Sequence, residues 1–208
     1  KEYRDGCKEA YRELVHLPSY SLDTNRQAKL VRPLYMHLLD EKDEKYAKER
    51  LIKALEDYGW RLGTGFLSTP FILYVLSDIN TEYSYKLLEN EEMPGWLYMT
   101  KNGANTIWES WEGTSAQSGI ASLNHYSKGA VVEWLFDSMC GIRIRGENEF
   151  DITPEPGGHF RFAKAKYDSE YGRVECGWGK KEGKVIYHIS VPSNTKAYVK
   201  LPNGREEI

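Results

Sequence analysis

One acidic side chain lies between two tryptophans near the middle of the chain, where residues 108–111 read WESW. A histidine follows a short distance later, in the NHY sequence of residues 124–126. Indole rings stack on the apolar C–H faces of a sugar ring, while a carboxylate binds hydroxyl groups or activates a water molecule. Glu109 and His125 therefore mark a candidate carbohydrate site, and Trp96 adds a third indole shortly before them.

The composition of the chain argues against several other classes of protein. The 208 residues carry 28 basic and 31 acidic side chains, so the net charge of −3 gives no basic footprint for nucleic acid. No apolar run approaches the ~20 residues that a membrane-spanning helix needs, and no signal peptide is visible. The chain begins with Lys1, so we expect it to be part of a longer polypeptide, whose compartment the sequence leaves unknown.

Apolar residues recur at helical spacing through the first part of the chain, which predicts amphipathic helices. We expect these helices to position the stretch from Pro94 to Tyr126, which carries the candidate site. These helices are predicted over residues 2–17, from a cap at 23–25 to residue 39, and over 43–58 and 81–89. Pro33 either kinks the second of these helices or marks its true start.

Two apolar segments are predicted to form inner, buried helices. The first is apolar over residues 71–76, with Thr69 as its N-cap and Pro70 at its first helical position. The second spans residues 122–140 and is closed by Gly141. Amphipathic outer helices alternating with apolar inner ones predict a partial (α/α)6 toroid, with about seven helices present.

The apolar period changes from near 3.6 to 2 at Ile142, which indicates strands. Alternating strands are predicted over residues 160–165, 173–178, 185–191 and 197–201. We therefore predict two domains: the C-terminal portion of a helical barrel over residues 1–141, and a small antiparallel β-sandwich domain over residues 142–208. The β domain is expected to be truncated, since a sandwich would need further strands.

The remaining tryptophans, cysteines and histidines are interpreted as structural. Trp60, Trp134 and Trp178 are assigned to the core, and the widely spaced Cys7, Cys140 and Cys176 are predicted to be small buried apolar residues. His16, His37, His159 and His188 have no partners at metal-binding spacing, and no Asp-rich loop is present. No metal and no cofactor are expected.

Several short motifs together resemble the C-terminal part of an α-L-rhamnosidase of glycoside hydrolase family 78. They are residues 65–70 (GFLSTP), 94–98 (PGWLY), 103–111 (GANTIWESW), 122–126 (SLNHY), the helix end at 141–142 and the turn at 191–195 (VPSNT). The motifs follow the family's order and spacing over about residues 60–201. The family's (α/α)6 barrel followed by a β-sandwich agrees with the fold that periodicity predicts.

The resemblance also implies roles for individual residues. Glu109 would be the general base that activates the attacking water, and His125 would contact the rhamnose. Trp96, Trp108, Trp111 and Asn124 are the further candidate substrate-binding residues. The chain has Asn105 where the family often has Thr, and Ser110 where it often has Arg, which leaves the fine specificity open.

An inverting hydrolase needs a second carboxyl group, ~6.5–9.5 Å from the first, to protonate the leaving oxygen. In the family this general acid precedes the inner helix that begins at Pro70, in a motif upstream of residue 1. Glu112 lies only three residues beyond Glu109, so the two would serve one side of a sugar. We therefore expect the isolated chain to be inactive and to need the preceding part of the same polypeptide. Its substrate would be a rhamnosylated glycoside or polysaccharide.

Other interpretations remain open at this point. The chain could belong to another toroid glycosidase, or to a polysaccharide lyase that uses Tyr126 beside His125. A non-catalytic carbohydrate-binding fragment acting through its β domain would show an exposed planar row of aromatic side chains there. Without the motif, Glu109 and His125 would more simply be structural residues.

Overall fold

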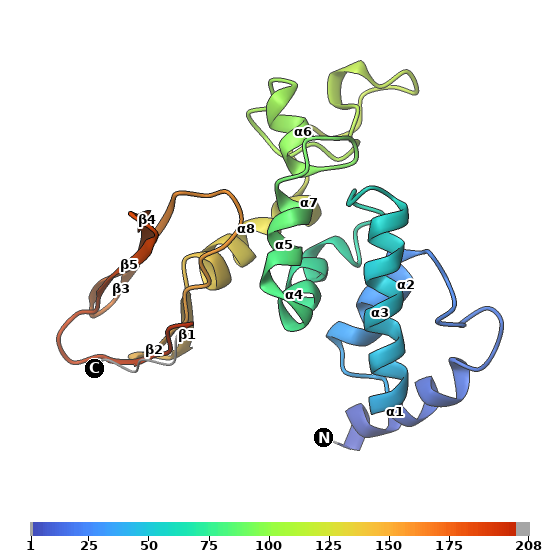
Figure 1. The fold of residues 1–208 in the computed structure, drawn as a ribbon, viewed down its shortest axis with the longest axis horizontal. Coiled ribbons are helices and arrows are strands. Elements are labelled where there is room, and N and C mark those ends of the chain that lie inside the picture. The colour runs from blue at the N-terminus through green and yellow to red at the C-terminus, as the bar shows by residue number, and fades with distance from the viewer. Residues whose placement is uncertain (1, 203–208) are drawn as a thin grey trace. The chain divides into compact units, whose positions relative to one another are not determined.

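The structure is a computed structural model that describes residues 2–202 (Figure 1). Two compact units divide the chain, a helical unit over Lys1–Ala130 and a second unit over Val131–Ile208. The strands of the described residues all belong to the second unit.

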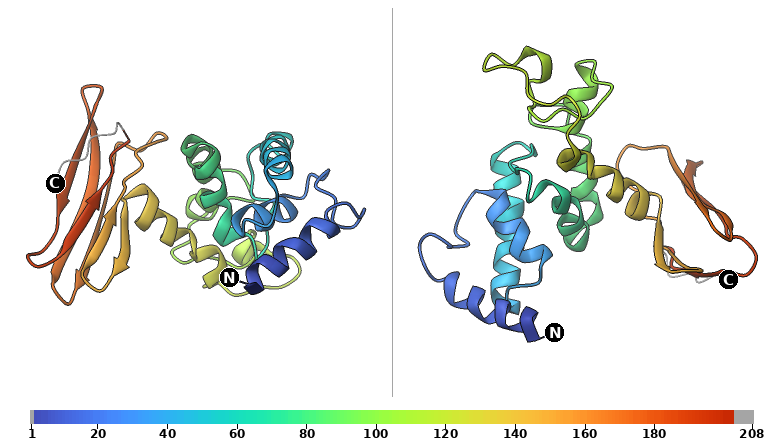
Figure 2. Two further views of the ribbon diagram at one scale, coloured as in Figure 1. Left: turned by 90° about the horizontal axis from the view of Figure 1, so that it is seen from below. Right: turned by 180° about the vertical axis from the view of Figure 1, so that it is seen from behind.

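The predicted helices of the first unit occur in the predicted order, and Figure 2 shows them from two further sides. The helix over Trp96–Lys101 was not predicted, and the second helix ends at Tyr35 and not at residue 39. The helices of this unit are α1 (Glu2–Leu14), α2 (Gln27–Tyr35), α3 (Glu41–Asp57), α4 (Thr69–Ile79), α5 (Thr81–Leu88), α6 (Trp96–Lys101), the 3-10 turn η1 (Gly113–Ser115) and α7 (Tyr126–Gly129). Helices α2 and α3 pack together, and α4 packs against both α2 and α5. Pro33 lies inside α2 and does not start it.

Helix α4 is the inner helix that its apolar sequence predicts. Its side chains Ile72, Leu73, Val75 and Leu76 are buried, and the Ser84 hydroxyl of α5 donates to the Leu73 carbonyl at 2.7 Å. The prediction of Thr69 as N-cap is wrong by one residue. Ser68 is the N-cap and Thr69 is the first helical residue, so Pro70 takes the second helical position and not the first as predicted. The Thr69 hydroxyl donates to the Gly65 carbonyl at 3.0 Å, and this bond anchors the preceding loop.

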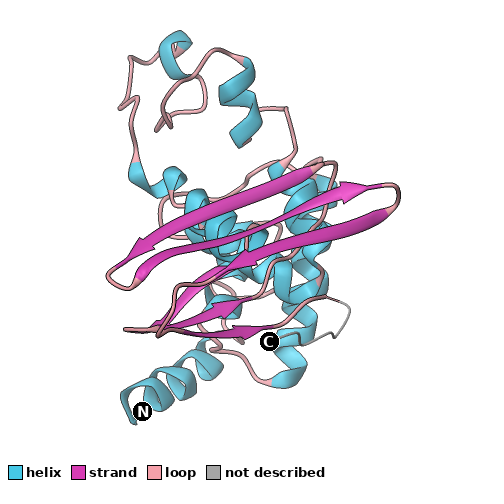
Figure 3. Cartoon of the chain, turned by 90° about the vertical axis from the view of Figure 1, so that its left-hand side faces the viewer, coloured by secondary structure: helices cyan, strands magenta, loops and turns pink. Residues whose placement is uncertain are grey.

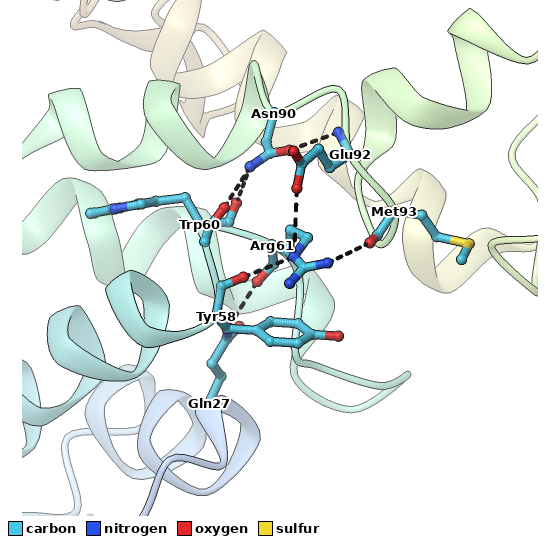
Figure 4. A network of polar contacts seen from close by, with 8 residues as sticks. Gln27, Tyr58, Trp60, Arg61, Asn90, Glu92 and Met93 are labelled. Atoms are coloured by element: carbon cyan, nitrogen blue, oxygen red, sulfur yellow. Dashed lines mark hydrogen bonds and ion pairs between the residues drawn. The ribbon is translucent and has the colours of Figure 1, made fainter.

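A polar network ties the loop after α3 to α2 and to the loop before α6 (Figure 4). The Gln27 amide donates to the Arg61 carbonyl at 2.9 Å, and the Asn90 amide donates to the Trp60 carbonyl at 2.9 Å. Trp60 adopts a φ of 55°, which these bonds help to hold. The network fixes the approach of the chain to Pro94 and α6, whose residues belong to the aromatic stretch.

The predicted helix over residues 122–140 is only partly correct. Helix begins at Tyr126 rather than Ser122, because residues 122–125 are irregular and Ser122 and His125 bond to another backbone segment. Beyond α7 the chain forms α8 (Val131–Trp134) and a π-helical segment, Leu135–Met139. Gly141 closes it with a φ of +89°, as predicted.

The second unit contains two three-stranded sheets, whose strands Figure 3 draws in magenta. One sheet has the order β1-β2-β6, from β1 (Ile142–Gly146), β2 (Glu149–Ile152) and β6 (Lys196–Val199); the other has the order β3-β4-β5, from β3 (Phe162–Ser169), β4 (Gly172–Lys181) and β5 (Lys184–Ser190). The pairing is antiparallel except between β2 and β6, which run parallel. Individual strand predictions missed β1 and β2.

Apolar side chains from both sheets form the core of this unit. The fully buried members are Ile142, Phe150, Ile152, Val174 and Cys176. The Trp178 indole N–H donates to the Met139 carbonyl at 2.7 Å, which joins β4 to the end of the π-helical segment. The fold is thus a set of paired helices followed by a small β unit, as predicted.

The three cysteines are free thiols with different environments. Burial raises the pKa of Cys140 to about 11 and that of Cys176 to about 12, so both remain protonated and inert. The prediction of a buried residue is wrong for Cys7, which is exposed on α1 because few contacts join that helix to the others. Trp60, Trp134 and Trp178 are buried as predicted.

Candidate active site

The two predicted site motifs lie on neighbouring irregular segments of the helical unit. The Glu109 N–H donates to the Ser122 carbonyl at 2.8 Å, and the His125 N–H donates to the Ile107 carbonyl at 2.7 Å. These bonds bring the WESW and NHY sequences together although the η1 turn separates them in the chain. The site therefore depends on tertiary pairing of two irregular segments.

The Glu109 carboxylate is partly exposed and is held by one backbone donor. Its Oε2 atom accepts a hydrogen bond from the Ser122 N–H at 3.0 Å. The described residues give no hydrogen-bond partner to the other oxygen, Oε1. Glu109 is thus fixed in orientation through one oxygen, while the other has lone pairs available for a water molecule or a hydroxyl group.

His125 is the N-cap of α7, and its ring is fixed on both sides. The Nδ1 atom accepts a hydrogen bond from the Ser127 N–H at 3.3 Å, so in the neutral imidazole Nε2 carries the proton. The ring stacks on Phe66 with centroids 4.5 Å apart and on Tyr126 with centroids 5.2 Å apart. The Ser127 hydroxyl in turn donates to the Phe66 carbonyl at 2.8 Å. His125 can therefore present an N–H donor to a hydroxyl group.

The predicted aromatic lining divides into buried and accessible residues. Trp96 and Trp108 are 5% and 7% exposed, whereas Trp111 is half-buried and Asn124 is exposed. Gly113, at a φ of +54°, lies against the Trp108 ring, where an added Cβ would overlap the ring carbons. In the described residues, the accessible indole beside Glu109 is therefore that of Trp111.

Lys128 joins three of the predicted residues and was missed by the sequence analysis. Its ammonium group donates to the Glu109 carbonyl and lies 3.7 Å from the centroid of the Trp111 ring. The Trp96 indole N–H donates to the Lys128 carbonyl at 3.0 Å. Burial lowers the pKa of Lys128 to about 8, against the opposing attraction of Glu112 and Glu109. The available signal was a lysine three residues after His125, within a helix predicted to be inner and buried.

No cluster of metal-ligating side chains occurs among residues 2–202. Within the same residues, no helix has the length and apolar character needed to cross a bilayer. The chemistry that the arrangement offers is that of a carboxylate, an imidazole and an indole face. Such a set can bind a sugar ring and remove a proton from a water molecule.

Inner and outer helices followed by a two-sheet β unit define a six-hairpin type of glycosidase domain. The chain matches the bacterial alpha-L-rhamnosidase 6 hairpin glycosidase domain over residues 2–139 and the bacterial alpha-L-rhamnosidase C-terminal domain over residues 146–208. The chain therefore belongs to the bacterial alpha-L-rhamnosidase family.

Individual relatives agree with this assignment. An alpha-L-rhamnosidase of Streptomyces avermitilis is 36% identical over 85% of this chain, and one of Formosa agariphila is 34% identical over 88%. The crystal structure of the Streptomyces avermitilis enzyme complexed with L-rhamnose has a TM-score of 0.77 at 35% identity, covering 84% of this chain and 18% of that one. The native Aspergillus terreus enzyme has a TM-score of 0.83 at 28% identity, covering 95% of this chain and 24% of that one. The chain spans 18% and 21% of the length of the two named sequence relatives.

Proposed function

We propose that this chain forms part of an inverting glycoside hydrolase that releases terminal α-L-rhamnose. Its contribution is the general base and part of the sugar pocket. The observation that carries the proposal is the pairing of the Glu109 and His125 segments, which brings a carboxylate and an oriented imidazole onto adjacent backbone. Similarity to enzymes named alpha-L-rhamnosidase supports the choice of sugar.

In the proposed reaction Glu109 takes a proton from a water molecule as that water attacks the anomeric carbon of the rhamnose. A carboxylic acid on the opposite face protonates the leaving oxygen, and the configuration at the anomeric carbon inverts. His125 donates its Nε2–H to a sugar hydroxyl, and Trp111 offers its ring to the sugar's C–H face. Trp96 and Trp108, being buried, would act mainly by supporting the two segments, while Asn124 remains an exposed candidate contact.

The general acid is proposed to lie in the preceding part of a longer polypeptide, so that the 208 residues alone would be inactive. On this proposal residues 1–141 are the C-terminal portion of a catalytic barrel, and residues 142–208 are a C-terminal β domain. The substrate would be a rhamnosylated glycoside or polysaccharide.

The test is hydrolysis of p-nitrophenyl α-L-rhamnoside by the 208-residue chain and by the complete polypeptide, each with and without Glu109→Gln. We expect activity only in the complete polypeptide, and a loss of about 10²–10⁴-fold in kcat in the variant, as for removal of a general base. Glu133→Gln is the matched control, since this exposed carboxylate of α8 should leave kcat within about twofold. Activity in the short chain would disprove the missing acid, and an active Glu109→Gln enzyme would disprove the base.

A binding role for the β unit is the second candidate, and the arrangement of its aromatic residues disfavours it. Phe162, Tyr171 and Tyr198 are 71%, 40% and 45% exposed. Phe162 begins β3, Tyr171 lies in the turn at the other end of that strand, and Tyr198 belongs to the other sheet. These three do not form the planar row that a sugar-binding surface would present.

A further inference from the structure

We propose that Lys128 is a positioning residue for the reaction, holding the Glu109 backbone and the Trp111 ring in register with each other. This inference rests on the proposed function and adds to it a residue that the rhamnosidase motifs do not name. It concerns how the base is held, not which group is the base.

The contacts of Lys128 converge on the residues of the site. Its ammonium group donates to the carbonyl of Glu109 itself and faces the Trp111 ring 3.7 Å away, a distance within the range of cation–π attraction. Its own carbonyl accepts the Trp96 indole N–H. One side chain thus fixes both ends of the segment that runs from the carboxylate to the accessible indole.

The position of Lys128 in the chain extends this connection to the histidine. Lys128 lies in α7, the short helix for which His125 is the N-cap. A shift of α7 would therefore move the imidazole and the ammonium group together. The geometry couples the sugar-contacting histidine to the base through a single turn of helix.

Burial makes a purely structural explanation of this lysine unfavourable. Lys128 is 4% exposed, and removing an ammonium group from water is costly unless hydrogen-bond acceptors and negative charges compensate for it. An apolar side chain would fill the same space without that cost. The compensation comes from a carbonyl, a ring face and the nearby Glu109 and Glu112 charges, and these belong to the site segment.

The choice of acceptor matters for the chemistry. The ammonium group donates to the Glu109 main-chain carbonyl, while the carboxylate accepts from the Ser122 N–H. The lysine therefore holds the base without occupying the side-chain oxygens that would receive the proton from water. A positioning role follows from this geometry, whereas a role as proton donor to the substrate does not.

The experiment compares Lys128→Met with wild type in the complete polypeptide, using p-nitrophenyl α-L-rhamnoside. Misplacing a catalytic group by about 1 Å costs up to about 10²-fold in rate, so we expect kcat to fall by about 10- to 100-fold. The KM should rise by a smaller factor than kcat falls, because the Trp111 ring that Lys128 holds is only one of the proposed sugar contacts, whereas the placement of the base acts on the chemical step. Lys128→Arg, which keeps a cation over the ring, should recover part of the lost kcat.

Lys86→Met is the matched control, because Lys86 lies over the Trp60 ring at 4.2 Å but on the exposed surface of α5. It should leave both kcat and KM unchanged. If Lys128→Met does not fold by circular dichroism, Lys128→Gln replaces it; its shorter amide cannot reach both partners, so the same loss of kcat is expected.

The inference is overturned if the folded Lys128 variant keeps kcat within twofold while Glu109→Gln is inactive. It is also overturned if Lys128→Arg is no better than Lys128→Met. If Glu109→Gln is itself active, the proposed base is wrong, and that failure is recognised independently of the lysine variants.

Discussion

Two glutamates, one in each unit, meet lysines in opposite ways. Glu175 in β4 accepts from the ammonium groups of Lys164 at 2.7 Å and Lys166 at 3.2 Å, both from the neighbouring strand β3. These hydrogen bonds lower the pKa of Glu175 to about 2. Glu109 also has a lysine beside it, but Lys128 donates to its backbone carbonyl. Among residues 2–202 the Glu109 carboxylate accepts one hydrogen bond, from the Ser122 N–H.

The backbone explains the difference between the two glutamates. In an antiparallel sheet, cross-strand neighbours lie side by side on one face, so lysines reach a glutamate carboxylate directly and neutralise it. Segments 106–109 and 122–125 follow no such regular pattern, and their lysine approaches from a helix. The regular pairing of β3 and β4 thus places two lysines on the Glu175 carboxylate. The irregular pairing of segments 106–109 and 122–125 leaves one oxygen of the Glu109 carboxylate available for chemistry.

The largest expected effect tests how tightly the backbone at Gly113 packs against the Trp108 ring, next to Glu109. Gly113→Ala places a methyl group into the Trp108 ring at a positive φ, and we expect a destabilisation of about 2–5 kcal/mol from overpacking and backbone strain together. Gly183→Ala, in the β4–β5 turn, has a similar φ of +75° but open space around the added Cβ, so it should cost only about 1–2 kcal/mol.

Amide hydrogen exchange, followed residue by residue, measures the loss of stability in both glycine variants. Exchange should accelerate around residues 105–125 in Gly113→Ala and only around the turn in Gly183→Ala. Equal effects in the two variants would mean that Trp108 moves aside freely and that the site segment is not tightly packed.

A smaller effect is expected from Ser127→Ala. The Ser127 hydroxyl is buried and donates to the Phe66 carbonyl, so its loss leaves that acceptor unpaired at a cost of about 1–3 kcal/mol. Thermal unfolding followed by tryptophan fluorescence should show the loss. Ser190→Ala, at an exposed position of β5, should leave the transition unchanged. A Ser127 variant as stable as wild type would show that the His125–Phe66 stack does not need this bond.

The smallest effect concerns stability in acid and depends on Glu175, whose carboxylate is paired with two lysines. Because the folded-state pKa of Glu175 is about 2 and its ordinary value is 4.5, the ionised form is favoured on folding. The stabilisation is fully present above about pH 4.5 and is lost as the pH falls toward 2. Between about pH 4.5 and pH 2, the melting temperature of wild type should therefore fall more steeply than that of Glu175→Gln. Above about pH 4.5 the two melting temperatures should change with pH in parallel. If the thermal stabilities of wild type and Glu175→Gln changed in parallel over the whole pH range, the assigned ion pairs would be contradicted. In the complete polypeptide, rhamnoside hydrolysis near neutral pH should be equal for wild type and variant.

Local patterns in the sequence were sufficient for many of the elements, but not for α6, β1 or β2. The apolar run at 71–76 predicts the buried helix α4, Gly141 predicts the helix end, and strict alternation predicts β3, β4 and β5. These predictions succeed because periodicity and backbone preference act over a few residues. Strands β1 and β2 were not predicted individually, since they are short and β2 pairs in parallel with the distant β6.

The sequence by itself determined the residue types of the site, a carboxylate between indoles and a nearby histidine, because these are written in two short motifs. Only the tertiary structure decided how they meet. Pairing of the two segments, burial of Trp96 and Trp108, and the reach of Lys128 to the Glu109 carbonyl all join residues that are distant in the chain. Such contacts depend on side-chain packing and desolvation across the whole unit, and no local pattern encodes them.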